Sequence, residues 1–158
     1  MWTRQSTREF EACKGATNRE LLHRLIEDGP APGLLAYKEG KPVGWVALGP
    51  RESYGRIQRS RVTKPVDDVS VWSITCFVIH RHHRRQGVAT ALLAGAIEYA
   101  TDRGATAIEG YPVEPRKDDM PDIYAWMGVA STFTKAGFEE IARRSERRPI
   151  LRLILENR

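Results

Sequence analysis

The longest β-rich run of the chain constrains its fold more than any other feature. It covers residues 69–79, and apolar side chains follow one another there almost without interruption. Such a run is typical of a central strand that is covered on both faces. Residues 87–100 then carry apolar side chains at helical spacing, and residues 105–109 form a second short β-rich run. A strand, a helix and a second strand in this order predict a right-handed parallel crossover within one sheet.

Shorter elements on both sides of this unit predict a mixed α/β fold. Capping boxes that begin at Ser6 and Thr17 predict two helices near the start of the chain. No repeat or linker divides the chain, so residues 1–158 are expected to form a single domain. The remaining expected elements are a hairpin (34–37 and 43–48), a loop (51–64), an irregular stretch (112–127), a short helix (130–136) and two strands (138–144 and 150–155).

Composition narrows the classes of function. No apolar run reaches the roughly 20 residues that a membrane span needs, and the start of the chain lacks the apolar core of a signal peptide. The only cysteines are Cys13 and Cys76, which argues against a disulfide framework and for a cytoplasmic protein. The net charge of +5 fits a polyanionic ligand such as a nucleotide cofactor, and it equally fits weak binding to nucleic acid.

The bend between the central strand and the long helix is the strongest candidate site. Gly87 allows a ligand to approach the backbone closely. The first amides of the following helix lack intrahelical acceptors and lie at the positive end of the helix dipole, while Arg84 and Arg85 offer donors suited to phosphate oxygens. These features predict a phosphate-bearing ligand, and an ordinary tight turn with solvated arginines is the alternative. No Walker loop or G-x-G-x-x-G motif is present.

Two motifs give the chain a family resemblance. Arg84, Gly87 and Ala89 fit the acetyltransferase pattern [Arg/Gln]-x-x-Gly-x-[Gly/Ala], and residues 131–138 resemble a cofactor-side helix that ends in a Gly-Phe step. From about residue 34 to 155 the chain therefore resembles the GNAT superfamily of N-acetyltransferases. The resemblance is closest to an uncharacterised bacterial branch, through Cys76-Phe77 and the Glu-Gly-Tyr-Pro sequence at 109–112. Members of that branch usually have an extra N-terminal segment that includes the first strand, and this chain begins inside the region that follows it. Either the start of the chain is assigned too late or that strand is absent.

The resemblance implies a fold and a cofactor. The fold would be a mixed, mostly antiparallel sheet, flanked by helices and splayed between its two central parallel strands. The pantetheine arm of acetyl-coenzyme A (acetyl-CoA) would lie in the splay and pair with backbone groups of Phe77 and Ile79. The implied cofactor-binding residues are Phe77, Val78, Ile79, Arg84, Arg85, Gln86, Gly87, Val88, Ala89, Thr90, Ser131, Phe133 and Lys135.

The implied reaction is direct attack of a primary amine on the acetyl thioester. An alkyl amine has a pKa near 10.4, so a base or a water chain must remove its proton. The central strand has no carboxylate, so Glu109, at the end of the next strand, is predicted as the base, with Glu114 second. In the family a tyrosine often acts as the general acid, and this sequence has Phe133 at that position. Tyr111, Tyr124 or water could donate the proton instead. The alternative function is a CoA-binding or acetyl-CoA-binding sensor without turnover.

Other conspicuous residues have ordinary explanations. Cys76 could form a covalent acetyl-cysteine intermediate. We interpret it instead as a small buried residue of the central strand. The cluster of His80, His82 and His83 lacks further ligands, so no metal site is expected. Two basic segments, 56–64 and 143–148, fit solvated faces or contacts to an acidic substrate or nucleic acid. We expect the partner to be a small-molecule or peptide amine, with neither membrane nor nucleic acid bound; a homodimer stays open.

Overall fold

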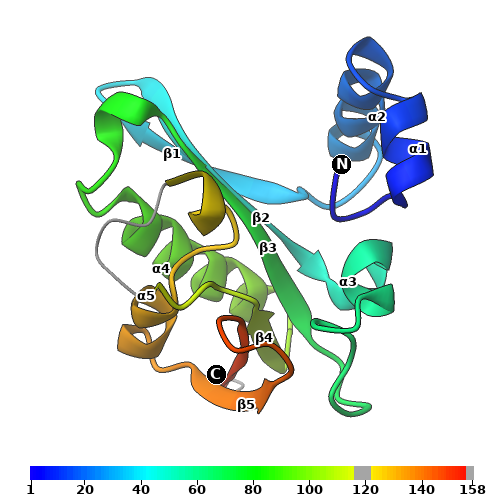
Figure 1. Cartoon of the computed structure of the whole chain (residues 1–158). Helices are drawn as coiled ribbons and strands as arrows, with labels where there is room; N and C mark the ends of the chain where they lie inside the picture. Colours follow the sequence, from blue (N-terminus) through cyan, green and yellow to red (C-terminus); the bar gives the residue numbers. More distant parts are fainter. Residues whose placement is uncertain (116–121, 156–158) are drawn as a thin grey trace.

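The fold is a six-stranded mixed sheet with helices on both faces (Figure 1). The computed structural model describes residues 1–115 and 122–155. The strand order is β1-β2-β3-β4-β6-β5, in which β3 and β4 are parallel and the other neighbours antiparallel. The mixed sheet and the parallel central pair are confirmed. The strands are β1 (Gly33–Lys38), β2 (Lys41–Pro50), β3 (Trp72–Ile79), β4 (Ala107–Gly110), β5 (Glu139–Arg143) and β6 (Pro149–Ile154).

The helices fall into two groups. Figure 1 shows α4 and α5 on one side of the β2–β3 pair, and α1, α2 and α3 on the other. In the described part of the chain no strand precedes β1, which lies at one edge of the sheet. The α-helices are α1 (Thr7–Ala12), α2 (Ala16–Glu27), α3 (Gly55–Arg59), α4 (Val88–Asp102) and α5 (Ala130–Lys135); 3₁₀ turns are η1 (Arg51–Ser53), η2 (Arg81–His83) and η3 (Asp122–Ala125).

One of the two predicted capping boxes is confirmed and the other is wrong. The Glu9 amide donates to the Ser6 hydroxyl at 3.2 Å, and the Glu9 carboxylate accepts from the Ser6 amide at 2.7 Å. Helix α2 instead begins at Ala16, directly after Gly15, which has φ +87° and provides no side-chain cap. The left-handed glycine lets the chain turn sharply between the two helices, so Thr17 falls inside the first turn.

The loop expected over residues 51–64 is also wrong in part, because it contains η1 and α3. Its sequence is polar, but Tyr54 and Ile57 are fully or almost fully buried. They pack with Tyr111, Met127 and Ile150 in a small core on the α3 side of the sheet. Two buried apolar side chains therefore hold this segment against the sheet. The segment is polar overall, so the sequence predicted a loop.

The two central strands separate after a short pairing. Only Trp72↔Ile108, Ser73↔Glu109 and Ile74↔Gly110 pair in register. Strand β3 continues to Ile79, whereas β4 ends at Gly110. The β2–β3 register passes from Cys76 to Ile74, so Thr75 is an extra residue of a β-bulge. A bulge bends its strand, and this one lies where β3 leaves β4.

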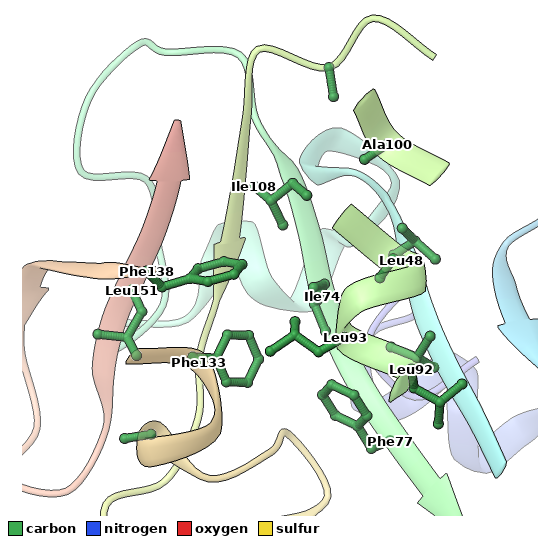
Figure 2. Close-up of a cluster of buried hydrophobic side chains, with 14 residues drawn as sticks. Leu48, Ile74, Phe77, Leu92, Leu93, Ala100, Ile108, Phe133, Phe138 and Leu151 are labelled. Carbon is green, nitrogen blue, oxygen red and sulfur yellow. The ribbon is translucent and has the colours of Figure 1, made fainter. Parts of the chain in front are cut away.

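The main core lies between the sheet and α4 and α5. Figure 2 shows Leu93 of α4 pointing toward Ile74 of β3 and toward Phe133 of α5. Phe133 makes edge-to-face contacts with Phe77 and Phe138, with ring centroids 6.1 and 5.1 Å apart. Such pairs add to the stabilisation from buried area. They fix the start of α5 against the open end of β3.

Candidate functional site

A cavity of about 500 Å³ opens where β3 runs past the end of β4. One wall is the end of β3 with the bend that follows it: Phe77, Val78, Ile79, Arg84, Arg85 and Ala89. The opposite wall comes from the chain before and within α5: Ala125, Trp126, Gly128, Val129, Thr132 and Phe133. The fold thus brings together two segments about 50 residues apart in sequence. The result is a largely apolar slot with a basic end.

The bend at the basic end has an unusual backbone. Arg85 has φ +57° and Gly87 has φ +80°, both in the left-handed region, which a non-glycine residue enters only at a cost. Helix α4 begins directly after Gly87, without a side-chain cap, and the Ala91 amide is bonded to the Gly87 carbonyl at 3.0 Å. The preceding amides, of Val88, Ala89 and Thr90, lie ahead of this first helical bond. They are donors available to an anion.

Side chains of the bend hold its shape. Arg84 Nε donates to the Ile79 carbonyl at 3.2 Å, and Gln86 Nε2 donates to the His82 carbonyl at 2.9 Å. The Gln86 side-chain carbonyl accepts from Lys38 Nζ at 3.3 Å. Lys38 ends β1, so the hairpin brings a further cation beside the bend, which the local motif did not indicate.

The free edge of β3 presents backbone groups to the cavity. The Phe77 amide donates to the Trp126 carbonyl at 2.6 Å, whereas the His80 amide donates to Val43 of β2 at 2.9 Å. Because peptide groups alternate in direction along a strand, those of Phe77 and Ile79 face away from β2. This is the orientation that pairing with an extended ligand requires. In this structure the Phe77 amide is already hydrogen-bonded to the Trp126 carbonyl.

Glu109 and Tyr111 lie together, away from the cavity. Glu109 is 1% exposed; its carboxylate accepts from Arg152 Nη2 at 2.6 Å, Arg51 Nη1 at 3.4 Å and the Tyr111 hydroxyl at 3.1 Å. The Tyr111 hydroxyl also lies 2.8 Å from Ser73 Oγ. Burial, and then the neighbouring carboxylate, raise the pKa of Tyr111 far above its usual range. The phenol therefore keeps its proton and donates a hydrogen bond to the Glu109 carboxylate.

The comparisons with known proteins identify the family. A family model described as the acetyltransferase (GNAT) family matches residues 1–124. The chain belongs to the GNAT acetyltransferase family. No protein of curated function matches the sequence closely enough to count as a relative.

Solved structures show the same GNAT fold at low sequence identity. The ribosomal-protein-alanine N-acetyltransferase from Brucella melitensis is 19% identical, with a TM-score of 0.55 over 87% of this chain and 76% of that one. Ard1 from Thermoplasma volcanium is 16% identical, with a TM-score of 0.53 over 97% and 95%. The NatC complex bound to Gag peptide and CoA is 15% identical, with a TM-score of 0.54 over 87% and 79%.

Most of the expected cofactor residues of this GNAT chain border the cavity or its bend. Phe77, Val78, Ile79, Arg84, Arg85, Ala89 and Phe133 line it, and Gln86, Gly87, Val88 and Thr90 complete the bend. Ser131 and Lys135 are exposed on α5, outside the lining. The sequence did not indicate Thr132, Val129 or Gly128. The one available signal was Gly128, which has φ +90° just before α5.

The remaining candidates lie as follows. Cys76 is half-buried, and burial raises the pKa of its thiol, which disfavours the nucleophilic thiolate. Within residues 1–115 and 122–155, no group of three or more His, Cys, Asp or Glu side chains could hold a metal ion. Tyr124 is exposed, and Glu114 pairs with Arg143 at 2.6 Å. No helix within the described ranges is long and apolar enough to cross a bilayer.

Proposed function

We propose that this GNAT protein transfers the acetyl group of acetyl-CoA to a primary amine by direct attack. The observation that carries the proposal is the shared cavity: an anion-binding bend at one end and the free edge of β3 along one wall. A nucleotide cofactor with a diphosphate and an extended amide-bearing arm matches this arrangement, because the diphosphate fits the bend and the arm fits the edge of β3. Acetyl-CoA would supply the activated acetyl thioester.

The residues of the bend would hold the diphosphate. The amides of residues 86–90 lie at the start of α4, where the helix dipole favours an anion. Arg84 and Arg85 would add charge-assisted hydrogen bonds, and Lys38 lies close enough to contribute. Arg84, Arg85 and Lys38 would then place three cations around the diphosphate.

The edge of β3 would hold the amide arm. The Phe77 amide can donate to a carbonyl of the arm only if the Trp126 carbonyl moves away from it. Phe133 and Val129 would cover the arm from the α5 side. We therefore expect the segment around Trp126 to shift when the cofactor binds, while β3 keeps its place between β2 and the core.

The chain must also manage the proton of the amine. Catalytic roles for Glu109 and Tyr111 stay predictions. A base must reach the amine directly or through one water, and neither side chain lines the cavity. Their hydrogen-bonded chain ends at Ser73 of β3, so we propose that they fix β3 against β4 at the start of the splay. A water at the cavity mouth would then take the proton.

Two measurements test the proposal. Acetyl-CoA should raise the melting temperature, and the rise should grow with the logarithm of its concentration above the dissociation constant. Amines that serve as acceptors should cause release of free CoA thiol. Thermal stabilisation without thiol release over a broad amine panel would favour the alternative, a sensor of acetyl-CoA. That alternative is supported by Phe133 and by the absence of a carboxylate on β3. No stabilisation by acetyl-CoA would contradict both. A cytoplasmic location, a possible homodimer and the lack of nucleic-acid binding stay predictions.

A further inference from the structure

A second cavity, of about 260 Å³, lies on the α3 side of the sheet. Three separate segments line it: Trp2 and Thr3, residues from 56 to 63, and the β5–β6 turn with Ser145 and Arg148. Trp126 and Met127 close it from the fourth side. Trp126 also lines the first cavity, so the two cavities share one lining residue. Thr3 Oγ1 lies 3.3 Å from Thr75 Oγ1 at the bulge of β3, which brings this wall against the splay.

The first cation in this cavity is Arg56. Its guanidinium lies 3.6 Å from the centre of the Trp2 ring. Nε donates to the Trp2 carbonyl at 2.9 Å and Nη1 to Thr7 Oγ1 at 3.1 Å. Nη2 is buried and has no hydrogen-bond partner within the described structure. A buried donor without an acceptor is costly, and a ligand oxygen would satisfy it.

The second cation in the lining of this cavity is Arg148. Its Nη1 donates to the Tyr111 carbonyl at 2.7 Å and lies 3.0 Å from the Met127 sulfur. Burial lowers the pKa of Arg148. Neither Arg148 nor Arg56 forms an ion pair with a carboxylate in the described residues. By contrast, Arg143 and Arg152 each pair with two carboxylates.

The surroundings are basic as well. Arg144 of the β5–β6 turn donates to the carbonyl oxygens of Lys64 and Pro65, the latter at 3.0 Å. This contact joins the two basic segments of the sequence, 56–64 and 143–148, around one cavity. None of the described residues that line it is acidic. A partly buried cationic cavity whose described lining carries no acidic side chain is complementary to an anion.

We infer that this cavity binds the acceptor, and that the acceptor carries a carboxylate or phosphate group beside its amine. The inference rests on the proposed acetyl transfer and names the class of substrate. Arg56 and Arg148 bind the anionic group, Ser60 and Ser145 belong to the same lining, and the amine points past Trp126 toward the edge of β3. The arginines thus select the substrate and orient it, while the first cavity holds the acetyl donor.

The test compares acceptors in matched pairs. Each α-amino acid is assayed against its carboxamide, and O-phosphoethanolamine against ethanolamine, by thiol release and by calorimetric binding in the presence of CoA. We expect at least one acidic member to have a kcat/KM about tenfold or more above its neutral partner. The carboxylate and phosphate arms identify which anion is preferred. Arg148→Gln and Arg56→Gln should abolish the preference, with the KM for acetyl-CoA unchanged.

Matched controls separate the site from overall charge. Arg147→Gln, exposed in the same turn, and Arg61→Gln, exposed after α3, remove the same charge outside the lining, and both should retain the preference. Equal use of acidic and neutral amines, or no binding by any acidic amine while acetyl-CoA binds, would overturn the inference. If acetyl-CoA does not bind but an acidic amine still binds through Arg148, the proposed function fails and the anion site stands.

Discussion

The amide of Phe77 donates a 2.6 Å hydrogen bond to the carbonyl of Trp126. This bond joins the free edge of β3 to the segment that precedes α5, at the point where the two cavities adjoin. Trp126 lines both cavities. One residue therefore lies between the proposed donor site and the proposed acceptor site.

Replacing Gly87 with valine should remove acetyl-CoA binding while the fold survives. Gly87 has φ +80°, and a Cβ there would meet no atom within 4 Å. The substitution is therefore strained only by its backbone conformation, at a cost of about 1–3 kcal/mol. The strain would displace the amides of the bend, so the thermal stabilisation by acetyl-CoA should disappear.

Gly104→Val is the matched control for this change. Gly104 follows α4 with φ +71°, and a Cβ there also meets nothing within 4 Å. We expect a similar loss of stability with full retention of acetyl-CoA affinity, measured by calorimetry. If Gly87→Val bound acetyl-CoA as tightly as Gly104→Val, the bend would not be the phosphate site.

Replacing Glu109 with glutamine should destabilise the protein strongly. It leaves the guanidinium groups of Arg51 and Arg152 buried with one carboxylate fewer, and breaking such a buried pair costs about 3–5 kcal/mol. Asp67, which also pairs with Arg152, should hold the loss toward the lower value. Urea unfolding measures the change. Glu140→Gln breaks an exposed pair with Arg143 and should cost about 1 kcal/mol or less.

The same Glu109→Gln variant separates positioning from proton transfer. If Glu109 acts only by fixing β3 against β4, kcat should fall moderately, and the pH dependence of kcat should keep its shape. If Glu109 is the base, kcat should fall steeply and its dependence on pH should change, because the titrating group has been removed. The pH profile of the variant at saturating amine decides between the two.

Tyr111 makes a prediction about stability at high pH. The unfolded phenol titrates near pH 10, whereas burial and Glu109 raise the pKa of the folded phenol. Below about pH 10 both states keep the proton, so this group adds no pH dependence. Above it only the unfolded state releases the proton, so the free energy of unfolding should fall by about 1.4 kcal/mol per pH unit. Tyr111→Phe should show a shallower fall; an identical slope would contradict the assignment.

Cys76→Ser should keep most of the acetyl transfer. Burial raises the pKa of the Cys76 thiol, so the thiolate needed for a covalent route is scarce at neutral pH. Intact-mass spectrometry of the wild-type protein with acetyl-CoA and no amine should show no added acetyl group at Cys76. An acetylated Cys76 that disappears when amine is added would overturn direct attack.

The local sequence predicted those parts of the fold that depend on local signals. The apolar run at 69–79, the bend at Gly87 and the striped helix after it are each readable within about 30 residues, and the structure has all three. The resemblance to GNAT proteins supplied the splay between β3 and β4. The short helix α3 was not predicted, because Tyr54 and Ile57 are the only buried apolar residues in a polar stretch of sequence.

The parts of the site that depend on distant contacts could not be predicted. Glu109 meets Arg51 across 58 positions of sequence and Arg152 across 43. No local pattern specifies such partners. The same holds for Trp126, whose carbonyl reaches the Phe77 amide, and for the two basic segments, whose meeting around one cavity is set by Arg144. The residues of the bend are adjacent in the sequence, so their chemistry could be predicted from it. The proposed selection of the acceptor depends on contacts between residues that are distant in the sequence.

A crystal structure of the protein with CoA would show whether the bend and the free edge of β3 form the cofactor site. We expect the diphosphate on the amides of residues 86–90 beside Arg84 and Arg85, the pantetheine arm along β3 at Phe77, and Trp126 displaced from the Phe77 amide. A structure in which CoA is fully bound elsewhere, with the bend empty and the bond between Phe77 and Trp126 intact, would contradict this expectation.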